Sequence, residues 1–296
     1  MPLADPLLDP RYGPLAASDE VVEFCAAHIG DVEVVADLSW PHGGSRVLEL
    51  RDHRGTGWIA KAMRRNNYRT EREAYQRWVP ALGDRASQVV YSDDTLQVLV
   101  FRTIPGVIAD GTAYALDPRI HHQAGALLRC LHDCAPPSEA ADLATVLRTT
   151  VERAIDNART LGLLEPADAM AISFVGQIID DLVKVPIMMV PTHGDNQPRN
   201  WLVDDDGVVH LIDFGLTNLG WWGRDLNRLR QQQWRDRPDL QEAFFAGYGR
   251  NATPAEEVML RARDAQSALT TMFWARERND PSFEEHWHSV LIRMGL

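Results

Sequence analysis

The chain has 296 residues, of which 45% are hydrophobic, and it carries a formal net charge of −12 at pH 7. This hydrophobic content argues against disorder, and no apolar run reaches the roughly 18 residues that a membrane-spanning helix needs. The N-terminus has neither the basic nor the apolar region of a secretion signal. The charge disfavours nucleic acid as a partner and favours a cationic one, although solubility alone would also explain it. We expect a cytoplasmic protein, monomeric or weakly dimeric, without a membrane partner.

The first third of the chain predicts five strands and two helices, the second helix at about residues 70–79. Ser18, followed by two acidic residues, is typical of a helix N-cap, and the helix should run to about His28. The Pro-Gly pair at residues 105–106 ends the last strand. Short apolar runs bounded by turn residues predict the strands at residues 32–38, 46–51, 58–63, 89–91 and 96–101.

A glycine-rich loop lies between the first two predicted strands. It contains Gly43, Gly44 and Ser45. A loop of this kind between two strands can bring backbone N–H groups close to nucleotide phosphates. A plain hairpin loop would account for the same glycines. The chain has no Gly-x4-Gly-Lys-Ser/Thr motif, which excludes a P-loop nucleoside triphosphatase.

Lysine is rare in this chain, which makes Lys61 a candidate functional residue. Only Lys61 and Lys184 are lysines among the 30 basic residues, and Lys61 lies near the end of an apolar strand. A compact ammonium group can sit between phosphate oxygens and a carboxylate, where a guanidinium fork is too wide. Glu71 and Glu73 are the candidate carboxylates on the next helix, predicted at about residues 70–79, and they lie on different faces of it.

The remainder of the chain predicts a mainly helical region with a few short strands. A buried strand is expected at residues 186–190, and a hairpin is expected from the runs 201–203 and 208–212, joined by an Asp-Asp-Asp-Gly turn. The helices are predicted at residues 120–131, 141–161, 166–185, 238–248, 255–278 and 281–294.

Polar residues that could carry chemistry flank this hairpin. Pairing Val203 with Val208 would place Asn200 opposite Leu211, and Asp213 would follow about 7 Å along the strand. An amide carbonyl and a carboxylate are oxygen ligands that suit Mg²⁺. Asp195, five residues before Asn200, is placed to accept a proton from a hydroxyl group.

Three motifs in this order resemble the aminoglycoside phosphotransferase and choline kinase superfamily. They are His-Gly-Asp-Asn-Gln-Pro-Arg-Asn at residues 193–200, Ile-Asp-Phe-Gly at 212–215, and Asp-Leu at 225–226. The resemblance implies an α+β, two-lobed protein-kinase-like fold. Residues 1–103 would form an N-lobe with a five-stranded antiparallel sheet, and residues 104–296 a mostly helical C-lobe. It also implies an O-phosphotransferase that uses ATP or GTP with Mg²⁺.

The resemblance also implies roles for individual residues. Asp195 would be the catalytic base, Asn200 and Asp213 would bind the metal, and His193 and Asp225 would support the loop. Gln197 stands where the superfamily usually has His, and Trp221 stands where many members have Asp.

The nucleotide site is expected from the same resemblance. The family pattern Arg-Glu-Ala matches residues 72–74 and selects Glu73 as the partner of Lys61. The backbone around Phe101 and Thr103 would contact the adenine, and Gly43, Gly44 and Ser45 would cover the phosphates.

The acceptor side is predicted from acidic and aromatic residues near the C-terminus. Here the chain is most similar to actinobacterial phosphotransferases that act on aminoglycosides or on basic peptides such as viomycin and capreomycin. Carboxylates beside tryptophan rings could bind a cationic small molecule, although core tryptophans and solvated acids would explain the same residues. The candidate substrate residues are Asp236, Asp239, Asp280, Glu284 and Glu285.

Two alternatives to an antibiotic kinase remain at this point. A metabolic kinase for choline or an amino alcohol would be expected to use a small aromatic cage. A non-catalytic binding protein would be expected to have lost one of the four residues Lys61, Asp195, Asn200 and Asp213, and none is lost.

Overall fold

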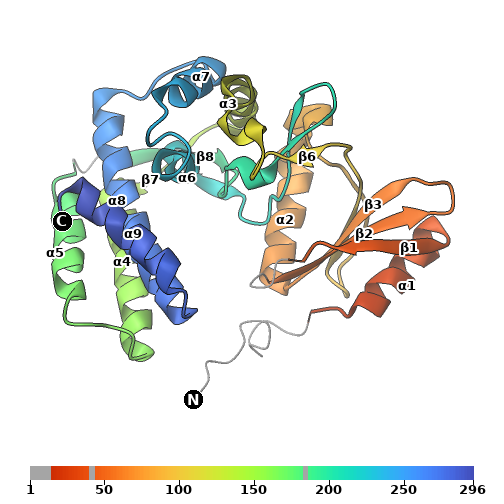
Figure 1. The fold of residues 1–296 in the computed structure, drawn as a ribbon, viewed down its shortest axis with the longest axis horizontal. Helices are drawn as coiled ribbons and strands as arrows, with labels where there is room; N and C mark the ends of the chain where they lie inside the picture. The colour runs from red at the N-terminus through yellow and green to blue at the C-terminus, as the bar shows by residue number, and fades with distance from the viewer. Residues whose placement is uncertain (1–14, 40–43, 183–185) are drawn as a thin grey trace.

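The computed structural model describes residues 15–39, 44–182 and 186–296, and these form two lobes (Figure 1). One lobe is built on a five-stranded sheet, and the other is mostly helical. The predicted α+β, kinase-like fold is therefore confirmed. No helix in the described part of the chain is both long and apolar enough to cross a membrane.

The sheet of the first lobe is antiparallel throughout, in the order β1-β2-β3-β5-β4. Strand β5 begins two residues later than predicted, because the Asp93 carboxylate accepts hydrogen bonds from the N–H groups of Thr95 and Leu96 and so forms a turn. The strands are β1 Val32–Asp37, β2 Ser45–Asp52, β3 Gly57–Met63, β4 Val89–Asp93 and β5 Val98–Arg102.

Two helices cover opposite faces of this sheet. Helix α1 (Ser18–Ile29) packs on one face, where Trp58, Ala60 and Ala62 of β3 are buried. Its N-cap is Ala17 and not the predicted Ser18, and the Glu20 carboxylate accepts a hydrogen bond from the Ala17 N–H. Helix α2 (Arg65–Arg77) covers the other face. Since side chains alternate along a strand, Lys61 lies on the α2 face.

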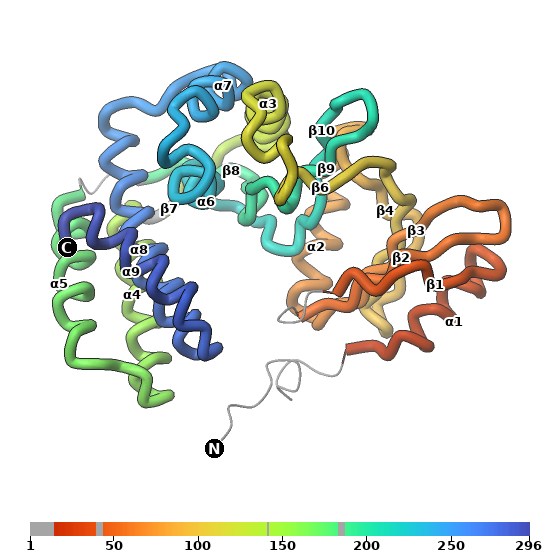
Figure 2. Tube along the Cα trace, viewed as in Figure 1, coloured from red at the N-terminus to blue at the C-terminus, as the bar shows by residue number. Residues whose placement is uncertain are grey.

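The chain passes from one lobe to the other between β5 and β6 (Figure 2). Strand β6 (Val107–Ile108) pairs with β9 (Trp201–Val203), which belongs to the second lobe. Gly106 has a φ of 141°, and a Cβ there would collide with the Val203 carbonyl oxygen. The expected boundary between residues 103 and 104 falls within this connection.

The second lobe packs its helices around two small sheets. Strand β9 pairs with β10 (Val209–Leu211), and β8 (Pro186–Thr192) lies between β7 (Ser138–Asp142) and β11 (Asn218–Trp221). Strands β7 and β11 are absent from the sequence prediction. The helices are α3 Pro118–Asp133, α4 Leu143–Thr160, α5 Asp168–Asp180, α6 Asn227–Gln231, α7 Pro238–Tyr248, α8 Pro254–Glu277 and α9 Pro281–Met294.

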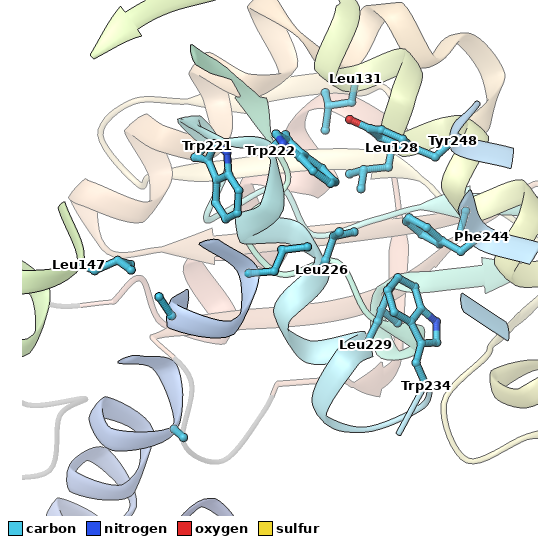
Figure 3. Close-up of a cluster of buried hydrophobic side chains, with 14 of the residues drawn as sticks. Leu128, Leu131, Leu147, Trp221, Trp222, Leu226, Leu229, Trp234, Phe244 and Tyr248 are labelled. Atoms are coloured by element: carbon cyan, nitrogen blue, oxygen red, sulfur yellow. The ribbon is translucent and has the colours of Figure 1, made fainter. Parts of the chain in front are cut away.

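Within the described residues, four short 3-10 helices connect these elements, namely η3 Val79–Arg85, η4 Ala113–Leu116, η5 Pro198–Asn200 and η6 Trp222–Leu226. The core of the second lobe is rich in large aromatic side chains (Figure 3). Helix α3 packs closely against α7, where a Cβ on Gly125 would collide with the Phe244 carbonyl oxygen, and the Trp222 ring of η6 stacks on Tyr248 of α7. The last three predicted helices match α7, α8 and α9 to within one residue at each end.

Candidate active site

The loop that follows β8 is held by one buried carboxylate, that of Asp225. It accepts hydrogen bonds from the backbone N–H of His193 (2.7 Å) and of Gly194 (2.6 Å). His132 Nε2 lies 3.0 Å from the same carboxylate, and His132 Nδ1 lies 2.8 Å from the Tyr248 hydroxyl. Burial raises the pKa of Asp225, but the hydrogen bond and charge of His132, together with the charges of His193 and Arg224, lower it by more, so the pKa lies below its usual value. Asp225 therefore stays charged and orients the loop.

A second set of contacts ties this loop to the segment after β10. His193 Nε2 lies 3.1 Å from the Ile212 carbonyl oxygen, and the Thr217 hydroxyl donates to the His193 carbonyl. Gly194 has a φ of 86°, and a Cβ there would collide with the Leu216 carbonyl oxygen. The close approach of the two segments therefore requires glycine at this position.

Asp195 is buried and lies in a network of side-chain donors. Gln197 Nε2 donates to Oδ1 (2.5 Å), and Arg199 Nη2 (2.6 Å) and Asn200 Nδ2 (2.9 Å) donate to Oδ2. The Asn200 amide also donates to the Asp195 carbonyl oxygen at 2.7 Å. A carboxylate has about four acceptor positions. Three donors therefore fix the orientation of Asp195 and leave room for one hydroxyl group.

The predicted register of the hairpin is wrong by one residue. Val203 pairs with Val209 and not with Val208, because the Asp204 carboxylate accepts from the N–H groups of Asp206 and Val208 and lengthens the turn. The Ile212 N–H donates to the Asn200 carbonyl oxygen at 3.1 Å. Asp213 therefore follows the residue opposite Asn200 directly.

Lys61 contacts one carboxylate in each lobe. Its Nζ lies 2.7 Å from Glu71 Oε2 and 2.8 Å from Asp213 Oδ1. The side chain of Glu71 is 1% exposed and that of Asp213 is 49% exposed. Lys61 lowers the pKa of Asp213 to about 2. Burial raises the pKa of Glu71, although Lys61 opposes the shift.

The predicted partner of Lys61, Glu73, is wrong. Glu73 is exposed and forms an ion pair with Arg77 one turn further along α2. The helix begins at Arg65, about five residues before the predicted start, and Tyr68, Glu71 and Tyr75 share the face that packs on the sheet. Glu73 lies off that face, so helical spacing decides against the Arg-Glu-Ala pattern.

The predicted nucleotide contacts of the first lobe are placed in part. Gly43 lies outside the described residues, while the Gly44 carbonyl accepts from the Arg64 N–H and Ser45 begins β2. The Thr103 N–H donates to the Gly57 carbonyl at 3.0 Å, so this N–H belongs to the sheet. The Phe101 ring packs against Tyr75, with ring centroids 5.0 Å apart. The phenyl ring of Phe101 is thus part of the core.

Two oxygen groups that could hold Mg²⁺ lie at the edge of this site. The amide nitrogen of Asn200 is bound to Asp195, which leaves the amide oxygen as the remaining group. Oδ1 of Asp213 contacts Lys61, which leaves Oδ2. Among the described residues, no group of three His, Cys, Asp or Glu side chains forms a metal site. Mg²⁺ is usually held by one or two protein groups together with substrate phosphates, so the donor set fits this ion.

The structure does not bring the five C-terminal acids together. Asp236 and Asp239 are exposed and pair with Arg235 and Arg237 respectively. The Asp280 carboxylate accepts from the Phe283 N–H and so caps α9. Glu284 pairs with Arg276, which also binds Asp168 of α5. Glu285 has no hydrogen bond or ion pair within the described part of the chain.

Arginines cover the tryptophan faces that a cationic ligand would need. The guanidinium carbons of Arg250, Arg278 and Arg228 lie 4.3, 4.0 and 5.3 Å from the ring centroids of Trp222, Trp274 and Trp287. Trp221, Trp222, Trp234 and Trp287 are buried. Most of the predicted aromatic residues are therefore core residues.

One residue of the site, Glu71, is missed by the sequence prediction. The Arg-Glu-Ala pattern selects Glu73, although the spacing of Glu71 from Tyr68 and Tyr75 marks the buried face of α2.

The comparisons with known proteins agree with this geometry. The model of the phosphotransferase enzyme family (APH) matches residues 42–260. No curated protein sequence matches the chain. A thermostable mutant of the aminoglycoside phosphotransferase APH(4)-Ia is 12% identical with a TM-score of 0.70, covering 93% of this chain and 99% of that one.

Two further solved structures share the fold at low identity. The macrolide 2'-phosphotransferase MphH from Brachybacterium faecium is 16% identical with a TM-score of 0.65, covering 92% of this chain and 97% of that one. The gentamicin complex of APH(2")-IIa is 17% identical with a TM-score of 0.66, covering 93% and 96%. With a family match over most of its length and this site, the chain belongs to the phosphotransferase enzyme family.

Proposed function

We propose that this enzyme transfers the γ-phosphate of ATP or GTP to a hydroxyl group of a cationic antibiotic. The observation that carries the proposal is the position of Lys61, which contacts Glu71 in its own lobe and Asp213 in the other lobe. Asp213 lies next to the loop that contains Asp195 and Asn200. A cation at phosphate-binding distance from a metal-binding carboxylate, together with a buried base, is the set that phosphoryl transfer requires.

Each residue has a separate task in this reaction. Lys61 binds phosphate oxygens of the nucleotide and is held in place by Glu71. Asn200 and Asp213 would hold Mg²⁺, which offsets the charge of the phosphates. Asp195 accepts the proton of the acceptor hydroxyl while the hydroxyl oxygen forms a bond to the γ-phosphorus and the nucleoside diphosphate leaves. Gln197 and Arg199 keep the carboxylate of Asp195 in one orientation.

The choice of acceptor rests on neighbours and charge. A mutant of APH(4)-Ia was solved with AMP-PNP and hygromycin B, and APH(2")-IIa was solved with gentamicin. Both are under 25% identical to this chain, so they support the antibiotic class by analogy of fold. The net charge of −12 favours capture of a cationic molecule.

The rival acceptor, choline or an amino alcohol, has less support. Such a ligand would be expected to use open aromatic faces as a cage. Among the described residues, arginines lie over Trp222, Trp274 and Trp287.

A phosphorylation screen tests this proposal. Aminoglycosides, basic cyclic peptides, macrolides and amino alcohols would each be incubated with ATP and with GTP, and phosphorylated product would be measured by mass spectrometry. Product should form with a cationic antibiotic, and Asp195→Asn serves as the inactive control. Product from amino alcohols alone would favour the metabolic kinase. A nucleotide-binding protein that phosphorylates none of them would contradict the proposal.

A further inference from the structure

Positive charge is concentrated beside the catalytic carboxylate of this acidic protein. Arg228 interacts electrostatically with Asp195 and is repelled by Arg199. Arg263, in turn, is repelled by Arg224 and Arg228, and burial together with this repulsion lowers its pKa to about 10. The acid acting on Arg228 is Asp195, which already accepts hydrogen bonds from three side chains. Arg199 and Arg228 therefore both act on Asp195, although the chain as a whole carries a net charge of −12.

The backbone of Arg228 is held rigidly. It lies in α6, three residues after the loop-holding Asp225. Its neighbour Asn227 donates to Asp264 (3.0 Å) and accepts from the Ser267 hydroxyl (2.8 Å), and both of these partners are buried in α8. The guanidinium lies 5.3 Å from the ring centroid of Trp287, which is fully buried. The indole ring is a flat support against which the guanidinium can rest.

Arg228 lacks the partners that the neighbouring arginine has. Arg230, on the same helix, pairs with Asp264 (2.9 Å) and Glu257 (3.1 Å). Arg228 makes no hydrogen bond and no ion pair within the described part of the chain. A half-buried cation without a partner is costly, and burial lowers the pKa of Arg228 below its usual value. Its five N–H donors are therefore available to a ligand.

We propose that Arg228, resting on Trp287 beside Asp195, binds an anionic oxygen group during the reaction. The arginine fork matches the spacing of phosphate and carboxylate oxygens. Two sources have this chemistry, namely the terminal phosphate of the nucleotide and an acid group on the acceptor. The proposal rests on the proposed phosphotransferase function, and it adds a residue that orients the transferred group or selects the acceptor.

Ligand binding tests this role without turnover. The proteins are wild type, Arg228→Gln, Arg228→Lys and the control Arg278→Gln, which removes another arginine that lies over a tryptophan, Trp274. Calorimetry would measure the Kd of ADP, of AMP-PNP, and of inorganic phosphate added to protein saturated with AMP-PNP. The control should match wild type in every titration.

The two sources give different results. If Arg228 binds the nucleotide, Arg228→Gln should weaken AMP-PNP by about tenfold or more, as expected for a charge-assisted hydrogen bond, and leave ADP unchanged. If it binds the acceptor, AMP-PNP should be unchanged, and inorganic phosphate should lose its binding to the AMP-PNP complex. Arg228→Lys keeps the charge without the fork and should show a smaller loss in the same titration.

Unchanged affinity for AMP-PNP and for inorganic phosphate in Arg228→Gln would overturn the proposal. If Arg228→Gln does not fold, Arg228→Lys decides by the same criterion, because it keeps the buried charge. These titrations are independent of the acceptor screen. If the proposed acceptor class is wrong, the titrations still show whether Arg228 binds an anion. If Arg228 binds no anion, the acceptor screen can still show phosphoryl transfer.

Discussion

The acids that form or hold the catalytic loop differ in burial and hydrogen bonding from the acids of the C-terminal helices. Asp195 and Asp225 are buried, and each accepts two or more hydrogen bonds from the loop itself. Asp236 and Asp239 are exposed, and each is neutralised by an arginine one or two residues away. The first pair is fixed by the fold, while the second pair responds to solvent and salt.

The difference teaches how far acidic composition can be read as function. A net charge describes the whole surface, whereas a catalytic carboxylate is defined by the donors around it. In this chain the spacing of Asp195, Asn200 and Asp213 locates a site, while the C-terminal acids are dispersed among their own arginines. The following substitutions test that contrast, from the largest expected effect to the smallest.

Replacing the base should have the largest effect. Asp195→Ala should reduce kcat by about 10²–10⁴-fold, because a positioned general base contributes about that much. The Kd of AMP-PNP should stay near wild type, since the role proposed for Asp195 is to accept a proton from the acceptor hydroxyl. Steady-state kinetics and calorimetry would measure the two quantities. A parallel loss of nucleotide affinity would show that Asp195 serves the nucleotide instead.

Removing the carboxylate that holds the loop should mainly affect stability. Asp225→Ala leaves the N–H groups of His193 and Gly194 without an acceptor, and it leaves His132 buried beside a cavity. The free energy of unfolding should fall by about 2–4 kcal/mol. Urea unfolding would measure it, with Asp236→Ala as the exposed control. Equal values for the two variants would remove the contrast between the two regions.

The partner of Lys61 can be identified with two matched substitutions. Glu71→Gln should lower kcat/KM because Lys61 loses a buried partner, whereas Glu73→Gln should leave it unchanged. The opposite ranking of the two variants would restore Glu73 to the site.

The same pair of variants tests how the free energy of unfolding depends on pH. The folded pKa of Glu71 is raised, so the protonated form of Glu71 stabilises the folded state. This stabilisation is complete only below the unfolded pKa of about 4.3, and it is lost as the pH rises through the folded pKa. Relative to Glu71→Gln, wild type should therefore lose stability as the pH rises from about 4 towards neutrality. Urea unfolding at several pH values would show this trend, and Glu73→Gln should run parallel to wild type. A difference between Glu71→Gln and wild type that stays constant with pH would contradict the raised pKa.

The C-terminal acids should give the smallest effects. Asp236→Asn and Asp239→Asn each remove one exposed ion pair, so stability should change by less than about 1 kcal/mol. For a cationic antibiotic, KM of wild type should rise with ionic strength while kcat stays nearly constant. A KM that is flat between low and high salt would argue against electrostatic capture of the acceptor.

The sequence predicts most of the fold because the patterns involved are local. Alternation in residues 58–63 places Lys61 on one face of its strand, and the motif at residues 193–200 places Asp195 and Asn200 on one loop. Both depend on residues that are close in the chain. The five strands of the first lobe and the last three helices were predicted for the same reason.

The errors arise where a distant or a side-chain contact decides. The start of α2 is set by packing on the sheet, so the weak helix formers Asn66, Asn67 and Tyr68 are helical, and Glu71 faces Lys61. The hairpin register is set by the Asp204 carboxylate, which lengthens the turn. The position of Arg228 against Trp287 depends on two helices that meet only in the folded chain.

The role of Asp213 as a metal ligand is the central claim, and the Mg²⁺ dependence of nucleotide binding tests it most directly. Calorimetry would measure the Kd of AMP-PNP with and without Mg²⁺, for wild type and for Asp213→Asn. In wild type, Mg²⁺ should tighten binding, because Asp213 and Asn200 would supply oxygen ligands beside the phosphates. In Asp213→Asn most of that tightening should be lost while the fold is retained. Equal tightening by Mg²⁺ in both proteins would contradict the account.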